Sequence, residues 1–176
     1  MKSEGQQTVF IKAMEAQKGI LYKIASAYCH DEEDRKDLIQ EIIIQLWHAF
    51  HKYDSRYKMS TWIYCIALNV SISFYKKEKR RTQILHPMAR GSIIFTTENS
   101  SSEEIKPDLR RLQQYIAELR EIDKALIILH LEGHDHQEIA EIMGITTSNV
   151  SSRILRIKAR IKQKFQQLSK HKHERH

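Results

Sequence analysis

Residues 136–158, HQEIAEIMGITTSNVSSRILRIK, carry hydroxyl and guanidinium side chains at a spacing that suits hydrogen bonding to DNA. At about 100° per residue, one face of a helix through this stretch carries Ser151, Ser152, Leu155 and Arg156. This face belongs to the N-terminal half of the helix, which is the part that normally enters a major groove. The chemistry that these residues favour is recognition of a DNA duplex.

The residues around this face have the types that a helix-turn-helix requires. Ala140 supplies the small side chain needed where the two helices cross, and Gly144 tolerates the left-handed backbone of the turn. Ser148 can cap the second helix. The apolar stripe of that helix consists of Val150, Ile154, Ile157 and Ile161. A helix-turn-helix that binds DNA is predicted, and a plain helical hairpin packed for stability is the alternative.

The composition indicates an all-helical protein with a basic surface. The 176 residues include only five Gly and two Pro, among long runs of helix formers. The net charge is +7 at pH 7, and the segment from Arg153 to Lys172 has basic residues but no acidic ones. Such a run can be only a solvated face, but beside a helix-turn-helix it suits phosphate groups.

The sequence shows no arrangement of residues that indicates catalysis. Cys29 and Cys65 are too few and too far apart for a disulfide framework. His130, His134 and His136 cluster without zinc-ligand spacing, so we expect a structural or surface role for them. No pair of acids, Ser/His/Asp set or Gly-rich phosphate loop is visible. We therefore expect no catalytic, cofactor-binding or metal-binding residues, and no enzymatic activity.

The chain lacks the patterns of a secreted or membrane protein. No stretch approaches roughly 18 consecutive apolar residues, and the N-terminal MKSEGQQTVFIK lacks the apolar region of a signal peptide. We expect a cytoplasmic protein that does not insert into membranes.

Helical patterns are strongest in the first half of the chain. Helices are expected over 9–29, 37–52 and 62–81, with Ser60 or Thr61 as the cap of the third. The acids of HDEEDRKD at 30–37 suit the start of the second helix.

A change of composition follows these helices. Residues 83–108 include the acidic, Ser/Thr-rich stretch TTENSSSEEIKPD and are predicted to form a flexible linker. Helical patterning returns at Leu109 and continues to the C-terminus. The predicted organisation is therefore a domain at 1–82, the linker, and a second domain at 109–176.

The helix at 37–50 has a polar side with an isoleucine in its middle. Its broad apolar side consists of Leu38, Ile39, Ile42, Ile43, Leu46, Trp47 and Phe50. The opposite side carries Asp37, Gln40, Glu41 and His48, and Ile44 projects from it. A solvated face with one isolated isoleucine would give this pattern. A docking surface for a basic partner would give it too, and helical geometry does not choose between them.

The helix at 62–81 carries a narrow strip between two apolar sides. The strip holds Trp62, Cys65, Asn69, Ser73 and Lys76 and leads into the basic run KKEKRR at 76–81. The preceding loop, YDSRYKMSTW, interleaves Tyr57 and Trp62 with Arg56 and Lys58. Bases can stack on aromatic rings while cations follow the backbone, which favours binding of a single strand. The alternative, strongest for Trp62, is that these aromatic residues belong to the domain core.

Three ordered motifs resemble one protein family. They are DLIQEIIIQLWHAFHKYD at 37–54, STWIYCIALNVSISFYKKEKRR at 60–81, and DKALIILHLEGHDHQEIAEIMGITTSNVSSRILRIK at 123–158. Together they resemble a bacterial sigma-70 family RNA polymerase sigma factor of the extracytoplasmic-function class. The resemblance implies two helical domains, called regions 2 and 4 in the family, joined by the linker. It also implies a function: binding core RNA polymerase and directing it to promoters for transcription initiation.

The resemblance further implies the partners and the residues that contact them. Core RNA polymerase would be bound through its β′ clamp helices and β flap, and an anti-sigma factor would be a further partner. The residues implied for the clamp helices are Asp37, Gln40, Glu41 and Ile44. Those implied for the single-stranded −10 element are Arg56, Tyr57, Lys58, Trp62, Asn69, Ser73, Lys76, Lys77 and Arg80. Those implied for the −35 duplex are Ser148, Asn149, Ser151, Ser152, Arg153, Leu155, Arg156 and Lys158.

The chain departs from the family pattern at several of these positions. The family usually has Arg at 65, Asp at 73 and Arg at 76, where this chain has Cys, Ser and Lys. Because Ser151 is often Arg in relatives, Arg156 becomes the main candidate for recognition of a guanine.

Three other functions are alternatives. The first is a stand-alone transcriptional regulator with the same helix-turn-helix, which would bind an operator without polymerase. An inhibitor that binds polymerase and never reads DNA is the second, and a DNA-processing enzyme is the most distant.

Overall fold

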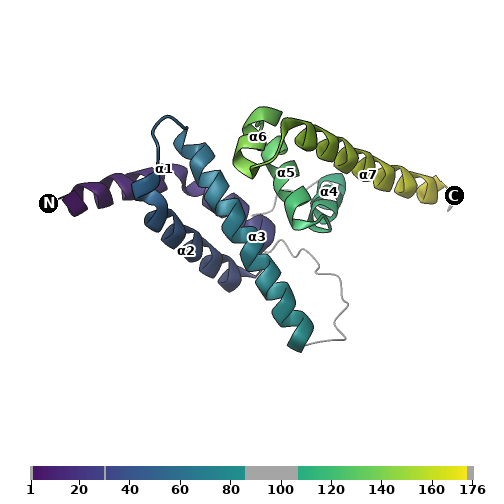
Figure 1. Ribbon diagram of the computed structural model, residues 1–176. Helices are drawn as coiled ribbons and strands as arrows, with labels where there is room; N and C mark the ends of the chain where they lie inside the picture. The colour runs from purple at the N-terminus through teal and green to yellow at the C-terminus, as the bar shows by residue number, and fades with distance from the viewer. Residues whose placement is uncertain (1, 30, 86–106, 174–176) are drawn as a thin grey trace. The chain divides into compact units, whose positions relative to one another are not determined.

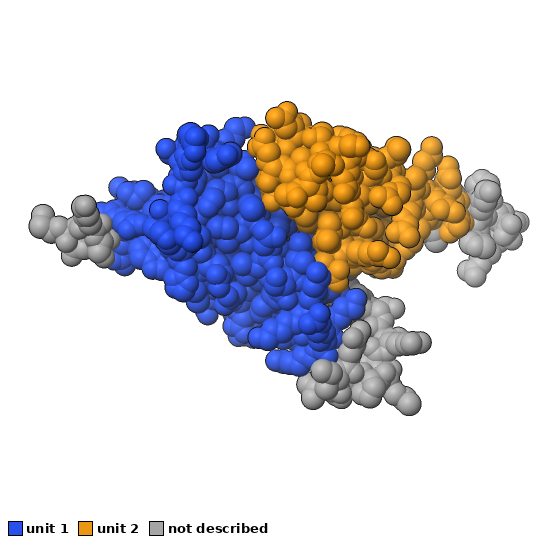
Figure 2. All heavy atoms as spheres, in the orientation of Figure 1, with its two compact units in different colours: residues 1–96 blue, residues 97–176 orange. Residues whose placement is uncertain are grey.

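The computed structural model describes residues 2–29, 31–85 and 107–173, with side chains described for 5–29, 31–81 and 107–167. The chain divides into two compact units, residues 1–96 and residues 97–176 (Figure 2). Every regular element in the described ranges is a helix, so the prediction of an all-helical protein with two helical domains is confirmed there. Most of the predicted linker, residues 86–106, lies outside the described residues.

The described part of the first unit, residues 2–29 and 31–85, consists of three long helices and one short one (Figure 1). They are α1 (Lys2–Tyr28), α2 (Glu32–Ala49), the 3-10 helix η1 (Phe50–Lys52) and α3 (Met59–Leu85). Helix α3 packs against both α1 and α2, as its two apolar sides predict. The side chains that are fully buried between these helices include Ile24, Leu38, Ile42, Leu46, Ile63 and Leu68.

Helix α2 begins five residues before its predicted start. The Asp31 carboxylate accepts hydrogen bonds from the backbone N–H groups of Glu33 and Asp34, at 2.9 and 3.1 Å. This N-cap satisfies two of the otherwise unpaired donors of the first turn. The acids of the first turn also favour a helix here, because the N-terminal end of a helix dipole is positive.

In its described residues, 107–173, the second unit contains four helices (Figure 1). They are α4 (Pro107–Ala117), α5 (Glu121–Leu131), α6 (His136–Met143) and α7 (Thr147–His173). Helices α5 and α6 both pack on α7. Asp135 caps α6 by accepting hydrogen bonds from Gln137 N and Glu138 N. Helix α6 ends at Met143, and its C-cap residue Gly144 has a left-handed backbone, with φ of 65° and ψ of 34°. The predicted helix-turn-helix is therefore present.

Two predicted helix caps are wrong. Helix α3 begins at Met59, so Ser60 and Thr61 lie inside it. Helix α7 begins at Thr147, so Ser148 lies inside it. The capping residue is Thr146, whose hydroxyl accepts a hydrogen bond of 3.2 Å from Asn149 N. Before α7 the sequence has three consecutive hydroxyl residues, Thr146, Thr147 and Ser148, and each has the chemistry of a cap. Helix α3 starts directly after Lys58, ahead of both expected caps.

Candidate nucleic-acid and polymerase interfaces

Helix α7 has one buried side and one open side. Val150, Ile154 and Ile157 are buried against the rest of the unit, which confirms the apolar stripe as far as residue 157, and Ile161 is half-buried. Ser148, Ser152, Leu155 and Arg156 form what we call the reading face, and all four are exposed. Leu155 is 70% exposed.

The hydroxyl of Ser152 donates a hydrogen bond to the carbonyl oxygen of Ser148, at 2.8 Å. Since a hydroxyl has a single proton, the oxygen of Ser152 remains as an acceptor on the reading face. Arg156 contributes donors beside this oxygen. Within the described residues, the Arg156 side chain makes a single hydrogen bond, a long one from Nε to Ser152 O, at 3.3 Å. The reading face therefore combines an acceptor, a cation and an apolar side chain.

Two residues predicted to contact DNA, Arg153 and Ser151, also make side-chain contacts within the second unit. Arg153 donates to the Asp123 carboxylate on α5, at 3.0 Å, and to Asn149 Oδ1, at 2.8 Å. The Arg153 side chain is 33% exposed and that of Asp123 is 16% exposed. This pair ties α7 to α5, a role that the sequence did not reveal.

Ser151 is also held inside the unit. It is half-buried, and its Oγ lies 2.8 Å from Nδ1 of His136, the first residue of α6. Ser151 Oγ donates its own proton to Thr147 O, at 3.0 Å. Among the remaining residues predicted for the −35 contact, Asn149 and Lys158 are exposed.

In the first unit, a short loop presents a tyrosine to solvent. Tyr57 is 57% exposed, and its backbone carbonyl accepts a hydrogen bond of 2.7 Å from the Tyr53 hydroxyl. Arg56 donates to the Asp54 carboxylate, at 2.7 Å, and this hydrogen bond lowers the pKa of that carboxyl. These two hydrogen bonds hold the Tyr57 carbonyl and the preceding residue Arg56 in place.

Trp62 is part of an aromatic cluster that supports this loop. Its ring centroid lies 5.2 Å from that of Tyr53 and 6.2 Å from that of Phe50. Phe50 in turn contacts Phe10 of α1, at 5.2 Å. The half-buried Trp62 therefore serves the domain core, as the structural alternative for this residue proposed, whereas Tyr57 remains available for stacking.

The strip on α3 continues from this cluster. Asn69, Ser73 and Lys76 are exposed, and so are Lys77 and Arg80. Cys65 is half-buried, and burial raises the pKa of its thiol, so it stays protonated near neutral pH. The Asn69 side-chain amide lies 3.9 Å from the Cys65 sulfur, and Ser73 Oγ donates to Asn69 O, at 2.9 Å. The strip is open for contact from Asn69 onward.

The polar side of α2 is exposed along its whole length. Asp37, Gln40, Glu41 and Ile44 are all exposed, and Ile44 is 47% exposed. Glu41 accepts a hydrogen bond from the Gln45 side chain, at 2.9 Å, which orients its carboxylate along the helix.

The apolar side predicted for α2 is broader than the one the structure buries. Leu38, Ile42 and Leu46 are buried, but Ile43 is 36% exposed and Trp47 is 40% exposed. Phe10 covers only part of Trp47, since the two rings meet edge to face with centroids 5.0 Å apart. The exposed apolar surface of α2 thus extends beyond Ile44.

Within the described residues, the structure offers no metal centre. No group of three or more His, Cys, Asp or Glu side chains there could hold a metal ion, and Cys29 and Cys65 are free thiols. The rings of His130 and His136 lie 6.0 Å apart and pack against each other. No helix in the same ranges is both long enough and apolar enough to cross a membrane.

These features define a class of protein. One unit has a helix-turn-helix with an open reading face, and the other is a helical bundle with an exposed tyrosine loop beside a basic strip. Sigma-70 region 2 matches residues 13–81, and the sigma-70 region 4 family matches residues 109–161. The chain belongs to the sigma-70 family of RNA polymerase sigma factors, in its extracytoplasmic-function class.

Relatives in two bacteria are similar over most of their length. The ECF RNA polymerase sigma factor SigX of Bacillus subtilis (strain 168) is 25% identical over 143 residues, which are 75% of this chain and 71% of SigX. The ECF RNA polymerase sigma-E factor of Haemophilus influenzae is 28% identical over 144 residues, which are 77% of this chain and 76% of that factor.

Two solved structures share the fold. The sigma factor RpoE of Bartonella quintana, in complex with the anti-sigma factor NepR, has a TM-score of 0.63 and 19% identity, covering 93% of this chain and 96% of that one. CnrH, in complex with the cytosolic domain of CnrY, has a TM-score of 0.64 and 19% identity, covering 91% and 89%.

Proposed function

We propose that this chain acts as a non-enzymatic sigma factor that recognises promoters at two elements. Two of its surfaces would contact DNA, and a third would contact core polymerase. The observation that carries the proposal is the reading face of α7, where Ser152, Leu155 and Arg156 are exposed while the opposite side is buried. The predicted domains, 1–82 and 109–176, would bind the −10 and −35 elements respectively, with 83–108 as the connection.

At the −35 element, α7 enters the major groove of the duplex. Arg156 is placed to form paired hydrogen bonds with O6 and N7 of a guanine. The free acceptor on Ser152 is complementary to the amino group of adenine or cytosine. Leu155 can contact the methyl group of a thymine. Ser148, Asn149 and Lys158 lie at the edges of this contact.

At the −10 element, the first unit binds a single strand. Tyr57 offers an exposed ring for stacking, and Asn69 lies on the adjacent strip with hydrogen-bonding groups exposed. A base that leaves the duplex there loses a few kcal/mol of stacking and pairing, which these contacts must offset. Lys76, Lys77 and Arg80 would follow the phosphates of the strand.

Core RNA polymerase is bound by the exposed side of α2. Asp37, Gln40 and Glu41 surround Ile44, so an apolar contact is ringed by acceptors suited to a basic partner. Ile43 and Trp47 extend this apolar area. The β′ clamp helices are the proposed partner of α2, and the β flap that of the second unit.

Free sigma factor should bind promoters weakly. Two modest DNA contacts act cooperatively only when their spacing matches the site, and polymerase fixes that spacing. We further propose that the protein works in the cytoplasm and that an anti-sigma factor controls it, as the complexes of NepR and CnrY with their own sigma factors suggest.

The test is transcription by reconstituted holoenzyme. The chain is combined with bacterial core polymerase and a library in which each randomised pair of −35 and −10 elements is linked to a barcode in the transcribed region, and the full-length transcripts are sequenced. Enrichment of a −35 and a −10 sequence at fixed spacing is the expected result, with core enzyme alone as the control. Absence of any promoter preference would overturn the proposal. A tight operator complex in a gel shift without polymerase would instead indicate a stand-alone regulator.

A further inference from the structure

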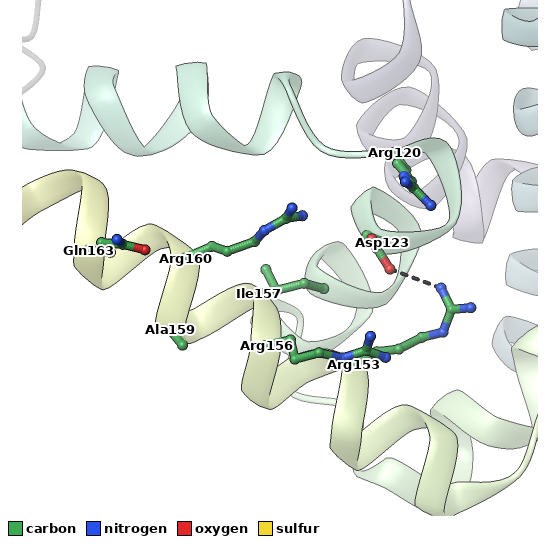
Figure 3. A pocket seen from close by; sticks show the side chains of 8 residues that line it. All are labelled: Arg120, Asp123, Arg153, Arg156, Ile157, Ala159, Arg160 and Gln163. Atoms are coloured by element: carbon green, nitrogen blue, oxygen red, sulfur yellow. Dashed lines mark hydrogen bonds and ion pairs between the residues drawn. The ribbon is translucent and has the colours of Figure 1, made fainter.

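A groove of about 490 Å³ lies between α7 and the start of α5 (Figure 3). Its lining consists of Arg120, Asp123, Arg153, Arg156, Ile157, Ala159, Arg160 and Gln163. Four of these eight residues are arginines and one is acidic. Figure 3 shows the arginines approaching the groove from two sides, along α7 and from the turn before α5. Since Arg120 and Arg160 lie outside the reading face, the helix-turn-helix pattern did not reveal them.

The single acid of the groove is already neutralised. Asp123 is paired with Arg153, and both side chains are largely covered. Arg120, Arg156 and Arg160 therefore supply an uncompensated positive charge. Within the described ranges, the side chains of Arg120 and Arg160 are exposed and make no hydrogen bond or ion pair, so their guanidinium groups are available to a ligand.

The start of α5 borders the same groove. Arg120 is the N-cap residue of α5, and its side chain makes no cap hydrogen bond. The acids of the first turn, Glu121 and Asp123, offset the partial positive charge of this helix N-terminus, so the arginines supply the attraction for an anion. Arginine side chains converging beside such a terminus suit phosphate oxygens, which can accept paired hydrogen bonds from one guanidinium.

We propose that this groove binds the sugar–phosphate backbone of the promoter duplex beside the −35 element, with Arg120 and Arg160 contacting phosphates. The inference rests on the proposed function and adds residues to it. Arg156 lines the groove and also belongs to the reading face, so the groove and the base-reading surface adjoin on α7. A duplex that places a base edge against Arg156 would therefore bring its own backbone to the groove. These phosphate contacts fix the register of the helix without selecting sequence.

The test compares holoenzymes carrying wild-type chain or the double variant Arg120→Gln, Arg160→Gln. Promoter affinity is measured over a range of salt concentrations, on a selected −35 element and on a scrambled one. The slope of log affinity against log salt concentration should fall by about 0.9 for each phosphate that the variant no longer neutralises. Affinity should fall by the same factor on both sequences. Arg120→Lys with Arg160→Lys should restore the slope, because a cation at each position is retained.

The matched control removes two positive charges elsewhere in the same unit. Arg110 and Arg111 on α4 are exposed, do not line the groove and lie outside the basic run 153–172, so Arg110→Gln with Arg111→Gln should leave the slope unchanged. An unchanged slope in the groove variant, or an equal fall in the control, would overturn the inference. Loss of co-elution with core polymerase would overturn it too, in favour of an acidic protein partner. If wild-type holoenzyme shows no promoter preference, the proposed function itself has failed.

Discussion

The Nδ1 atom of His136 lies 2.8 Å from the Oγ atom of Ser151 and connects the first residue of α6 to the recognition helix α7. Ser151 donates its only hydroxyl proton to Thr147 O. With this proton on Thr147 O, the tautomer of His136 that carries its proton on Nδ1 can donate it to Ser151 Oγ. This contact links the two helices of the helix-turn-helix and leaves Ser151 half-buried.

Replacing His136 with Ala should lower the free energy of unfolding of the second unit by about 1 kcal/mol, the usual net contribution of one hydrogen bond. Urea unfolding followed by hydrogen exchange in peptides from α7 would measure the loss. Because Ser151→Ala breaks the same bond, the double variant should cost less than the sum of the two single variants, by about 0.5 kcal/mol or more. Strict additivity would show that the two side chains do not interact.

Arg153 and Arg156 lie three residues apart on α7, and substitution by Ala should affect a different property at each. Arg153→Ala should lower stability, and Arg156→Ala should lower discrimination between bases. Arg153→Ala breaks the partly buried contact with Asp123 and should lower the free energy of unfolding by about 1 kcal/mol. It should leave the preference among −35 sequences unchanged. Arg156→Ala should leave stability nearly unchanged but cost roughly 1–3 kcal/mol of discrimination at one base pair. Binding of holoenzyme to selected and scrambled −35 elements separates the two.

The result for Arg156 can be contradicted in a specific way. If Arg156→Ala weakens binding to selected and scrambled −35 elements by the same factor, Arg156 contacts a phosphate and not a base. If Arg153→Ala relaxes the base preference, the ion pair with Asp123 opens when DNA binds.

How much of this could be predicted from sequence depends on the distance between partners. The helix-turn-helix follows from local features: a left-handed Gly144, the small Ala140 and a periodic apolar stripe. The partners of Arg153 and Ser151 lie 30 and 15 residues away on other helices, and no local pattern specifies which side chains meet there.

The exposed surface of α2 was misjudged for a related reason. Helical periodicity gives a direction for each side chain but not the width of the surface that covers it. In the structure, Phe10 of α1 meets Trp47 edge to face, and Trp47 and Ile43 remain partly exposed. The exposed surface of α2 is therefore more apolar than the sequence indicated.

His130 should make the second unit less stable in mild acid. Burial, followed by the nearby Lys158 and His136, lowers the pKa of His130 below its ordinary 6.5. The unfolded chain therefore binds a proton at a higher pH than the folded unit does. Stability is complete above about pH 6.5 and falls as the pH drops through the lower folded pKa. His130→Gln should reduce the loss of unfolding free energy between about pH 7.5 and 5.5. An identical loss in both proteins would exclude this histidine as the cause.

Cys29 should resist alkylation until the first unit unfolds. Burial, and then the Asp34 carboxylate, raises the pKa of its thiol from 9.0 to about 12. Because the thiolate is the reactive form, this rise lowers its population about a thousandfold near neutral pH. In a Cys65→Ser variant, iodoacetamide should label Cys29 rapidly in urea and very slowly in buffer, as measured by mass spectrometry. Comparable rates in the two conditions would show that the thiol is accessible in the folded chain.

Glu41→Lys should weaken binding to core polymerase while leaving the fold intact. Glu41 is exposed next to Ile44 on α2, so reversing its charge places a cation against the basic partner proposed for this surface. The matched control is Glu15→Lys, the same change at an exposed position of α1 in the same unit. Titration of labelled chain with core enzyme should show a weaker complex for Glu41→Lys only, with unchanged thermal unfolding of both variants. Equal affinities would remove Glu41 from the polymerase interface, and equal losses would show that affinity follows the net charge of the unit and not a specific contact.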